Sequence, residues 1–522
     1  MDPLETELVP SPRRLPVRLA AADLQGVDAR LVEIEAFVRS RSWGPPRVIG
    51  LGDTAVRESM ERVRTSFSSL GLDFPQGQLV VNLAPARDRK AGTGFDLGIA
   101  LAMACLTGAV PRRALHKLLV CAELGLDGTL RAVPGVLAMV ELARRQGLSH
   151  FVCARDALAL ASRAAGDECQ VLGFDSLGEL LDYLLGKAAH RPLEPEELSG
   201  PVPKTPSKFG RIRGQESARQ ALELAAAGGH HLLMSGPPGC GKTLIASCLP
   251  ELLPALNEEQ RLEVLKIRSL FGEPRTREQY EILETGRPPF RAPHHTVSYA
   301  GLVGGGQPLH PGEITLAHRG VLFLDELPEF RRESLEALRQ PLESGEIHVR
   351  RASAELHLPA RFQLLAAMNP CPCGMLGHPT LPCRDSSLAI ANYRRRISGP
   401  LLDRIDLQLQ MQPVAVEELL DERGVDETRA QRARERILAA RQRQQQRGCL
   451  NANIPEAQLS KLVPLSSSAE RLLRQGARSW QLSARALGRV LRVARTLADL
   501  DGDERIAEEQ IALALHFRVR PA

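Results

Sequence analysis

The spacing of apolar residues alternates between two periods over the first 185 residues of the chain. Alternation over residues 31–37 and short apolar runs at residues 48–52 and 79–83 predict strands. Apolar side chains at helical spacing predict a helix over residues 54–70. Further strands are expected at residues 118–122 and 151–153, and further helices at residues 98–106 and 136–145. This mixture predicts one α/β domain over residues 1–186, in which residues 1–18, rich in proline and arginine, are expected to be irregular.

A second α/β pattern follows a polar segment. Residues 187–210 are rich in Pro, Glu, Lys and Ser and are interpreted as a linker. Residues 347–358 alternate on both sides of a polar tip, which predicts a β-hairpin. Three buried strands are expected, at residues 231–235, 321–326 and 363–370. The sequence therefore predicts an α/β core over residues 211–411 and a helical region over residues 412–522.

The composition is that of a globular protein and disfavours several other classes. The chain has 522 residues, 43% hydrophobic and 25% charged, and this length predicts about two to four domains. It has no apolar run long enough for a membrane-spanning helix and no apolar signal core at the N-terminus, so a cytoplasmic protein with reduced thiols is expected. The net charge is only +5 and aromatic residues make up 4%. A polyanion site must therefore be a local basic surface rather than a broad stacking platform.

The stretch from Gly236 to Thr243 carries the clearest chemistry. It fits the pattern G-x-x-x-x-G-K-[ST] and lies between an expected strand and an expected helix. Glycines let backbone N–H groups close around phosphate oxygens, and the helix N-terminus adds a favourable dipole. Lys242 is expected to reach the β- and γ-phosphates of ATP, and the Thr243 hydroxyl to ligate Mg²⁺. The expected nucleotide-binding residues are Gly236, Pro237, Pro238, Gly239, Cys240, Gly241, Lys242, Thr243 and Leu244.

Two later strands end in polar residues that suit phosphate hydrolysis. The apolar run at residues 321–324 leads into Asp325 and Glu326. At the carboxyl edge of a parallel sheet, Asp325 is expected to bind Mg²⁺ through its water shell, and Glu326 to polarise the attacking water. A pair of acids that only starts a helix is the alternative, which the strand context and the order of motifs disfavour. The next strand ends at Asn369, and Pro370 keeps this amide at its tip.

The order of these motifs resembles that of AAA+ ATPases. Asn369 corresponds to the sensor-1 element, whose amide orients the lytic water or contacts the γ-phosphate. The hairpin resembles the pre-sensor-1 hairpin of the AAA+ branch that contains helicases and Mg-chelatase subunits. This resemblance implies that Arg350 and Arg351 contact DNA phosphates in a central pore. The alternative is a hairpin turn that is merely solvated.

Two arginine segments extend the resemblance toward the C-terminus. The run Leu401-Leu402-Asp403-Arg404 resembles the element in which an arginine acts as a finger into the neighbouring subunit's ATP. A finger supplied by a neighbour implies a ring, expected to be a hexamer. The run Ser483-Ala484-Arg485 resembles the sensor-2 helix of an AAA+ lid and implies that Arg485 points at the bound phosphates. Arg489, one turn further, is the alternative candidate.

Other segments resemble the Mg-chelatase-like ComM/YifB family. These are Gly50–Ser59, Asn82–Pro85, the glycine turn into Phe95–Leu97, and Phe290–Thr296. The family's N-terminal domain shares the fold of the Lon protease catalytic domain, an S5-domain-2-like fold. Lon proteolysis needs a Ser nucleophile and a Lys base, but Gly94 and Leu137 occupy those positions, so no peptidase activity is expected.

Cysteines after Asn369 suggest a metal site. Cys371, Cys373 and Cys383 stand near Asp385, which takes the place of a fourth family cysteine. Three thiolates and one carboxylate can hold Zn²⁺ tetrahedrally, although C-x-C departs from the common C-x₂-C spacing. A metal-free loop is the alternative. For the neighbouring pair His294 and His295 in the earlier segment, a loop role is preferred to a metal site.

The sequence thus predicts a Lon-like N-domain, a P-loop AAA+ core and a helical C-terminal lid. The resemblance implies ATP- and Mg²⁺-dependent movement of a ring on branched or single-stranded DNA, with branch migration during recombination in natural transformation. One alternative is a Mg-chelatase-type ATPase that remodels a protein partner. Another is an ATP-regulated binding module that turns over negligibly, which Glu326 and Arg404 argue against. No membrane partner is expected.

Overall fold

The chain forms two compact units in a computed structural model, and each is described by itself. The structure describes residues 15–39, 44–86, 90, 92–192, 207–270, 282, 284–306, 310–350, 355–414 and 425–518. Among these residues the first unit takes in 15–192 and 265–270, and the second takes in the remainder. The expected α/β core and the expected helical lid therefore belong to one unit.

The first unit is built on a seven-stranded mixed sheet with the order β3-β4-β2-β1-β5-β8-β9. The strands are β1 Val17–Gln25, β2 Asp28–Arg39, β3 Arg47–Ile49, β4 Gln78–Ala84, β5 Leu118–Val120, β8 His150–Ala154 and β9 Gln170–Phe174, with a small hairpin of β6 Glu123–Leu124 and β7 Leu130–Arg131. The helices are α1 Thr54–Ser69, α2 Asp96–Leu106, α3 Val136–Arg145, α4 Leu158–Ala165 and α5 Leu177–Leu184. Each predicted strand and helix of this region is confirmed, because alternation and helical spacing each bury one face of these elements.

Two expected boundaries are corrected by burial. Val17 and Arg18, expected in the irregular segment, begin β1, where Val17 is buried and pairs with Ala36 of β2. The linker predicted over residues 187–210 ends before residue 207, because Phe209 is buried in the core of the second unit. Residues 1–14 and 193–206 lie outside the described residues.

The second unit is built on a five-stranded sheet in which all neighbours are parallel. The strand order is β11-β14-β17-β10-β18, with the bounds β10 Leu232–Ser235, β11 Phe290–Arg291, β14 Val321–Leu324, β17 Gln363–Met368 and β18 Leu407–Gln410. All four residues of β14 and all six of β17 are buried, as expected for a sheet covered on both faces. Two short hairpins lie outside this sheet, formed by β12 Gly304–Gly305 with β13 His310–Pro311, and by β15 Glu346–Arg350 with β16 Glu355–Pro359.

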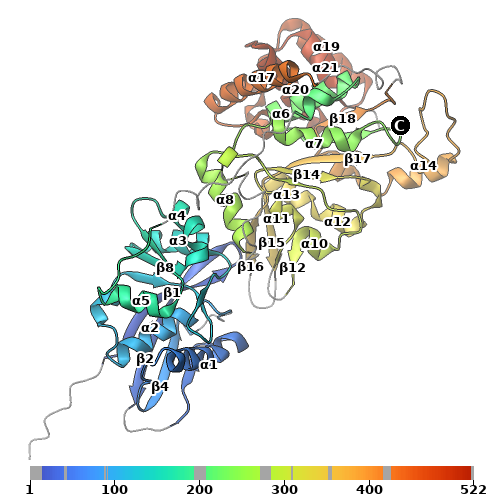
Figure 1. Cartoon of the computed structure of the whole chain (residues 1–522). Helices are drawn as coiled ribbons and strands as arrows, with labels where there is room; N and C mark the ends of the chain where they lie inside the picture. The colour runs from blue at the N-terminus through green and yellow to red at the C-terminus, as the bar shows by residue number, and fades with distance from the viewer. Residues whose placement is uncertain are drawn as a thin grey trace, which may run out of the picture. The chain divides into compact units, whose positions relative to one another are not determined.

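Helices cover both faces of the second sheet (Figure 1). One face is covered by α6 Glu216–Gly228 and α7 Lys242–Leu252, with the lid helices packed beyond them. The other face carries α10 Tyr299–Val303, α11 Glu313–Leu316, α12 Arg332–Ala337 and α13 Arg339–Ser344. The remaining helices are α8 Glu258–Ser269, α14 Ser387–Arg394, α15 Gly399–Leu402, α17 Glu427–Gln446, α18 Leu459–Leu462, α19 Ser467–Ser479, α20 Ala484–Asp501 and α21 Glu508–His516.

The helices that follow residue 425 share their hydrophobic core with the five-stranded sheet. Leu232 and Met234 of β10 belong to the same buried cluster as Ile437 of α17 and Val490 of α20. A boundary after residue 411 therefore marks a change from sheet to helices but does not divide two separate cores.

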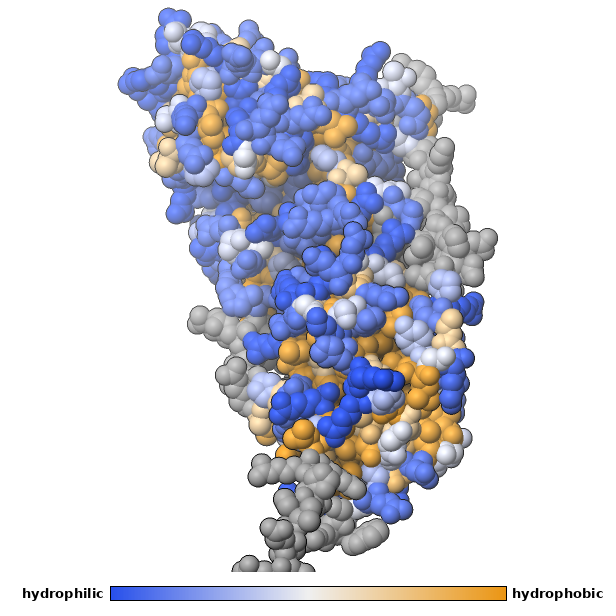
Figure 2. Space-filling model, turned by 90° about the vertical axis from the view of Figure 1, so that its left-hand side faces the viewer, coloured by the Kyte–Doolittle hydropathy of each residue, from blue (hydrophilic) through white to orange (hydrophobic). Residues whose placement is uncertain are grey.

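The surface differs between the units. Figure 2 shows mostly hydrophilic side chains over the lid and more apolar surface over the first unit. Among the large apolar residues exposed there are Leu31, Ile49, Leu51 and Leu126. Among the described residues, no helix is both long enough and apolar enough to cross a membrane.

Candidate active site

The predicted phosphate-binding loop joins β10 to α7 at the carboxyl edge of the second sheet. β10 lies between β17 and the edge strand β18, so the loop emerges from an interior strand of the sheet. Gly239 and Gly241 have φ angles of 79° and 89°, a left-handed backbone that favours glycine. A Cβ atom added at either glycine would meet nothing within 4 Å. The loop therefore offers an open backbone cradle at a helix N-terminus, which suits the phosphates of ATP.

The side chains of Lys242 and Thr243 connect this loop to the neighbouring strands. Lys242 Nζ donates to the carbonyl oxygens of Gly236 and Pro237 at 2.7 and 3.0 Å and to Asn369 Oδ1 at 3.1 Å. Burial lowers the pKa of Lys242 below its ordinary value. The Thr243 hydroxyl donates to Asp325 Oδ2 at 2.7 Å. The two expected Mg²⁺ ligands thus lie together, beside the lysine expected to bind phosphate.

The acidic pair leaves β14 at the same edge. The backbone N–H of Glu326 donates to Asp325 Oδ1 at 2.9 Å, and Glu326 has a left-handed φ of 51°. Such a backbone is uncommon for a residue with a side chain and is found more often at functional sites. It separates the directions of the two carboxylates, so that Asp325 faces Thr243 while Glu326 lies 3.1 Å from the His295 ring.

Asn369 completes this group at the tip of β17. Its amide oxygen accepts from Lys242, so the two predicted residues are in direct contact. Tyr393 on α14 interacts with the backbone of Asn369, and burial raises the pKa of Tyr393 to about 12. The tyrosine therefore stays a neutral phenol that supports the strand tip. The structure thus brings together Lys242, Thr243, Asp325 and Asn369, with Glu326 next in the chain.

The arrangement of these groups suits the binding of a nucleoside triphosphate together with Mg²⁺. Thr243 and Asp325 would hold the ion, which neutralises charge on the β- and γ-phosphates when bound. Lys242 supplies a further positive charge at the phosphates. Glu326 has a carboxylate available to accept a proton from an attacking water, and Asn369 can orient that water.

Arg404 and Arg485 lie elsewhere in the second unit. They line a cavity of about 950 Å³, whose walls contain seven arginines and four carboxylate side chains. Arg404 precedes β18, whose first residue pairs with Leu232 at the start of β10. Arg404 is therefore at the amino edge of the sheet, whereas the phosphate loop is at the carboxyl edge, roughly 13 Å away by strand rise. Arg485, expected at the bound phosphates, instead shares this cavity with Arg404.

Ion pairs that the sequence did not predict fix two of the arginines that line this cavity. Arg404, only 8% exposed, pairs with Glu343 of α13 and donates to the carbonyl of Pro400 at 2.6 Å. Arg489 pairs with Asp406 and donates to the carbonyl of Arg404 at 3.1 Å. Arg489, the alternative sensor-2 candidate, thus has a structural partner. No local motif signals these contacts, because the partners are 61 and 83 residues apart in the chain.

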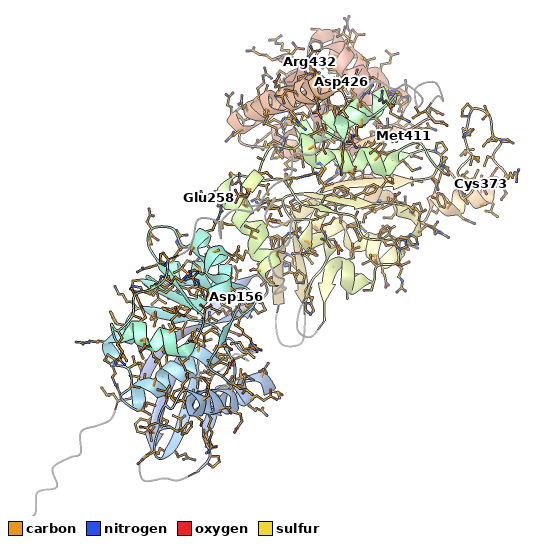
Figure 3. The ribbon with its side chains drawn as sticks, viewed as in Figure 1. Asp156, Glu258, Cys373, Met411, Asp426 and Arg432 are labelled. Carbon is orange, nitrogen blue, oxygen red and sulfur yellow. The ribbon has the colours of Figure 1, made fainter. Side chains whose placement is uncertain are left out.

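The three predicted thiols converge after β17. The Sγ–Sγ distances among Cys371, Cys373 and Cys383 are 3.4, 3.5 and 3.6 Å, and a carboxylate oxygen of Asp385 lies 3.8 Å from the Cys383 sulfur. Figure 3 shows Cys373 on the loop beside α14. Tetrahedral bonds of about 2.3 Å to zinc require sulfur separations of about 3.8 Å. The set therefore fits a zinc ion and is too far apart for disulfides.

The remaining predicted residues fall in other places. Arg350 ends β15, and Arg351 lies outside the described residues. In the first unit a Cβ at Gly94 would lie only 3.0 Å from the Cys121 sulfur, and Leu137 is buried. Burial raises the pKa of Cys121 to about 12, so this neighbour remains a thiol rather than a nucleophilic thiolate.

Comparison with known proteins agrees with this arrangement. The family model "Magnesium chelatase, subunit ChlI" matches residues 208–419, "Subunit ChlI of Mg-chelatase" matches residues 37–157, and "Magnesium chelatase, subunit ChlI C-terminal" matches residues 427–518. The protein YifB of Escherichia coli strain K12 is 37% identical over 495 residues, 94% of this chain and 95% of YifB. The competence protein ComM of Haemophilus influenzae is 38% identical over 501 residues, with 94% and 95% covered. The chain belongs to the Mg-chelatase-like ComM/YifB family.

Membership of the ComM/YifB family makes the second unit an AAA+ ATPase core with a helical lid. A more distant match supports the Lon-like part of the fold, since Lon protease 2 of Bacillus subtilis is 30% identical over 149 residues, 27% of this chain and 26% of that protein. ATP and Mg²⁺ are the cofactors consistent with this family and with the contact between Thr243 and Asp325.

Proposed function

We propose that this ComM/YifB protein is an ATP-driven ring motor that moves on branched or single-stranded DNA in the cytoplasm. The proposed task is branch migration during recombination, in a process such as natural transformation. The proposal draws on the similarity to the protein named competence protein ComM and on the geometry of the candidate ATP site. The observation that carries the proposal is the separation of Lys242 and Glu326 from Arg404 at opposite edges of one sheet.

That separation favours a site shared between subunits. Arg404 is nine-tenths buried, and its Nε atom has no hydrogen-bond partner among the described residues. Since Arg404 cannot reach the phosphate loop of its own chain, a neighbour's ATP is the γ-phosphate it would serve. A head-to-tail contact of this kind closes into a ring, and a hexamer is the size proposed. Arg485 lines the same cavity and would act on the same neighbour.

Mixing two inactive variants tests the shared site. Glu326→Gln removes the base and Arg404→Ala removes the finger, so each variant alone should hydrolyse ATP very slowly. In a randomly mixed ring, about a quarter of the sites join an intact Glu326 to an intact Arg404. Mixing should therefore restore about a quarter of the wild-type rate. Rings shown to be mixed by mass spectrometry that gain no activity would contradict the shared site.

The DNA contact is proposed at the β15–β16 hairpin. Arg350 ends β15, and Arg351 follows it in the sequence. The Mg-chelatase-like alternative would use the same ring on a protein partner. ATPase activity that depends on a protein and not on DNA would favour that alternative.

We further propose that Cys371, Cys373, Cys383 and Asp385 hold one Zn²⁺ ion. The convergence of three sulfurs within 3.6 Å of one another supports this. A structural zinc would brace the phosphate loop, because a Cβ at Gly374 would lie 2.6 Å from Pro238. Metal analysis should find one zinc per purified chain and none in Cys371→Ser or Cys383→Ser. Wild-type protein without zinc would contradict this assignment.

A further inference from the structure

The β15–β16 hairpin brings two histidines and a glutamate together on one face. Glu346 and His348 are two residues apart on β15, so their side chains leave this strand on the same side. His357 of β16 is paired directly opposite His348. The two imidazole rings meet edge-on, with their centroids 4.4 Å apart. The sequence predicted the hairpin but not this cluster, because the cluster depends on the register between the two strands.

The opposite face of the hairpin is packed and fixes this register. Ile347 and Leu358 are paired across the two strands and are 4% and 0% exposed. A slip of one residue would turn Ile347 toward solvent, so the burial of this pair holds His348 opposite His357. Glu346 and His348 are partly exposed, and His357 is exposed. The polar face is therefore both fixed in its spacing and open to solvent.

The three side chains converge without satisfying one another. His348 Nε2 lies 4.0 Å from Glu346 Oε2, which is beyond hydrogen-bond range. Within the part of the chain that the structure describes, the side chains of Glu346, His348 and His357 make no hydrogen bond. By contrast, both ring nitrogens of the buried His230 have hydrogen-bond partners. The ligand atoms of the hairpin cluster are therefore available to an external ligand.

The spacing and chemistry of the cluster suit a divalent transition metal. One ligand atom from each of the three side chains lies within 4.8 Å of the others. Tetrahedral zinc bonds of about 2.0–2.1 Å to nitrogen and oxygen require ligand separations of about 3.4 Å. Rotation of side chains that face solvent can close this difference without moving the backbone. Two imidazoles and one carboxylate favour Zn²⁺ and similar ions over Mg²⁺ and Ca²⁺, which prefer oxygen ligands.

We propose that Glu346, His348 and His357 bind one divalent transition-metal ion, Zn²⁺ in the first place, and that this ion cross-links β15 to β16. The two strands form a separate two-stranded sheet, and such a sheet is only marginally stable in water. An ion held by both strands stabilises their pairing and register. Three protein ligands leave a fourth position for water, so this ion should exchange more readily than zinc in the cysteine cluster. The site does not depend on the proposed movement on DNA.

Titration calorimetry with Zn²⁺ tests the site in the full chain, desalted beforehand to remove exchangeable metal. The wild type should take up one ion per chain beyond its content after desalting, and millimolar Mg²⁺ should not compete. His348→Ala and His357→Ala should each weaken this binding by at least about tenfold. His516→Ala removes an exposed histidine of α21 and is the matched control, which should bind as the wild type does. Co²⁺ bound in place of this Zn²⁺ should lack sulfur-to-metal charge-transfer absorption, which distinguishes the hairpin site from the cysteine cluster.

Amide hydrogen exchange tests whether the ion joins the two strands. At a free Zn²⁺ concentration about ten times the Kd, opening of the hairpin should become roughly tenfold rarer in the wild type. The amides of β15 and β16 should therefore exchange more slowly with Zn²⁺ in the wild type, but not in His357→Ala.

The outcomes separate the site from the cross-link. No Zn²⁺ uptake beyond the desalted content, or an affinity unchanged in both histidine variants, would overturn the site. Zn²⁺ binding that leaves the exchange of the hairpin amides unchanged would overturn the cross-link. If His348→Ala fails to fold, His357→Ala decides the result, because His357 is exposed.

Discussion

At the scale of single residues, the site depends on two adjacent carboxylates that contact different partners. Asp325 and Glu326 are adjacent, yet the left-handed backbone at Glu326 sends one carboxylate to Thr243 and the other to His295. The identities of Lys242, Thr243, Asp325 and Glu326 could be predicted because phosphate and Mg²⁺ chemistry imposes local spacing. The partners His295 and Glu343 could not, because they approach only after the sheet and α13 are assembled.

A buried histidine gives the unfolding free energy a pH dependence. His318 is 3% exposed, and its Nδ1 accepts the backbone N–H of Arg361 at 3.1 Å. Burial lowers the pKa of His318 from 6.5 to about 4, with Glu263 acting in the opposite direction. Because the folded pKa is depressed, the unfolded chain binds the proton first as the pH falls. Stability should therefore be lost between pH 6.5 and 4, by roughly 3 kcal/mol from this group.

Urea unfolding at pH 7.5, 6 and 5 checks this expectation. His318→Gln keeps an acceptor for the Arg361 N–H but does not titrate, so its stability should fall less steeply below pH 6.5. An identical pH dependence in the wild type and in His318→Gln would show that the imidazole is not the titrating group.

At the scale of elements, the loop after β17 supports the phosphate loop. Gly374 has a φ of 80°, and a Cβ there would lie 2.6 Å from Pro238 Cδ. Gly377 has a similar φ of 77°, but its Cβ would meet only Gln410, at 3.8 Å. Alanine at either position should cost about 1–2 kcal/mol of stability. Only Gly374→Ala should also raise the KM for ATP, because it displaces Pro238.

Titration with a fluorescent ATP analogue measures this difference directly. Gly377→Ala is the matched control, since it shares the backbone strain and lacks the contact with the phosphate loop. Equal nucleotide affinities in the two variants would mean that Pro238 is not held by the cysteine loop.

The helix α20 is joined to the amino edge of the sheet by a buried charge. Asp406 pairs with Arg489 and with the His230 ring, 3.1 Å away, and His230 Nε2 lies 2.7 Å from the Thr496 hydroxyl. Burial alone would raise the pKa of Asp406, but His230 and Arg489 hold it below its ordinary value. Asp406→Asn should therefore destabilise the second unit by about 3–5 kcal/mol, since it leaves Arg489 unpaired.

Calorimetry of Asp406→Asn checks this value against a nearby control. Asp403→Asn changes a carboxylate that is half exposed and 3.9 Å from Arg518, and should cost no more than about 1 kcal/mol. Comparable losses in the two variants would contradict a special role for the Asp406 pair.

At the scale of the whole molecule, the order of the elements along the chain was easier to predict than the contacts between them. Strands β10, β14 and β17 and the β15–β16 hairpin were predicted because each has a periodic apolar pattern and polar termini. β1 was not predicted at all, because Pro16 and the arginines before it mask the alternation that begins at Val17. Arg485 was expected to point at the bound phosphates because the motif gives its helix, but the motif does not show at which edge of the sheet that helix lies.

The proposed function requires ATP hydrolysis at Glu326 to be coupled to DNA. The most direct measurement is the Mg²⁺-dependent ATPase rate of the full chain, with and without four-way-junction DNA, beside Glu326→Gln. We expect strong stimulation of the wild type by the junction, and a rate in Glu326→Gln lower by roughly 10²–10⁴-fold with ATP binding retained. A wild-type rate that no DNA changes would contradict the DNA motor, and an active Glu326→Gln would contradict the assigned base.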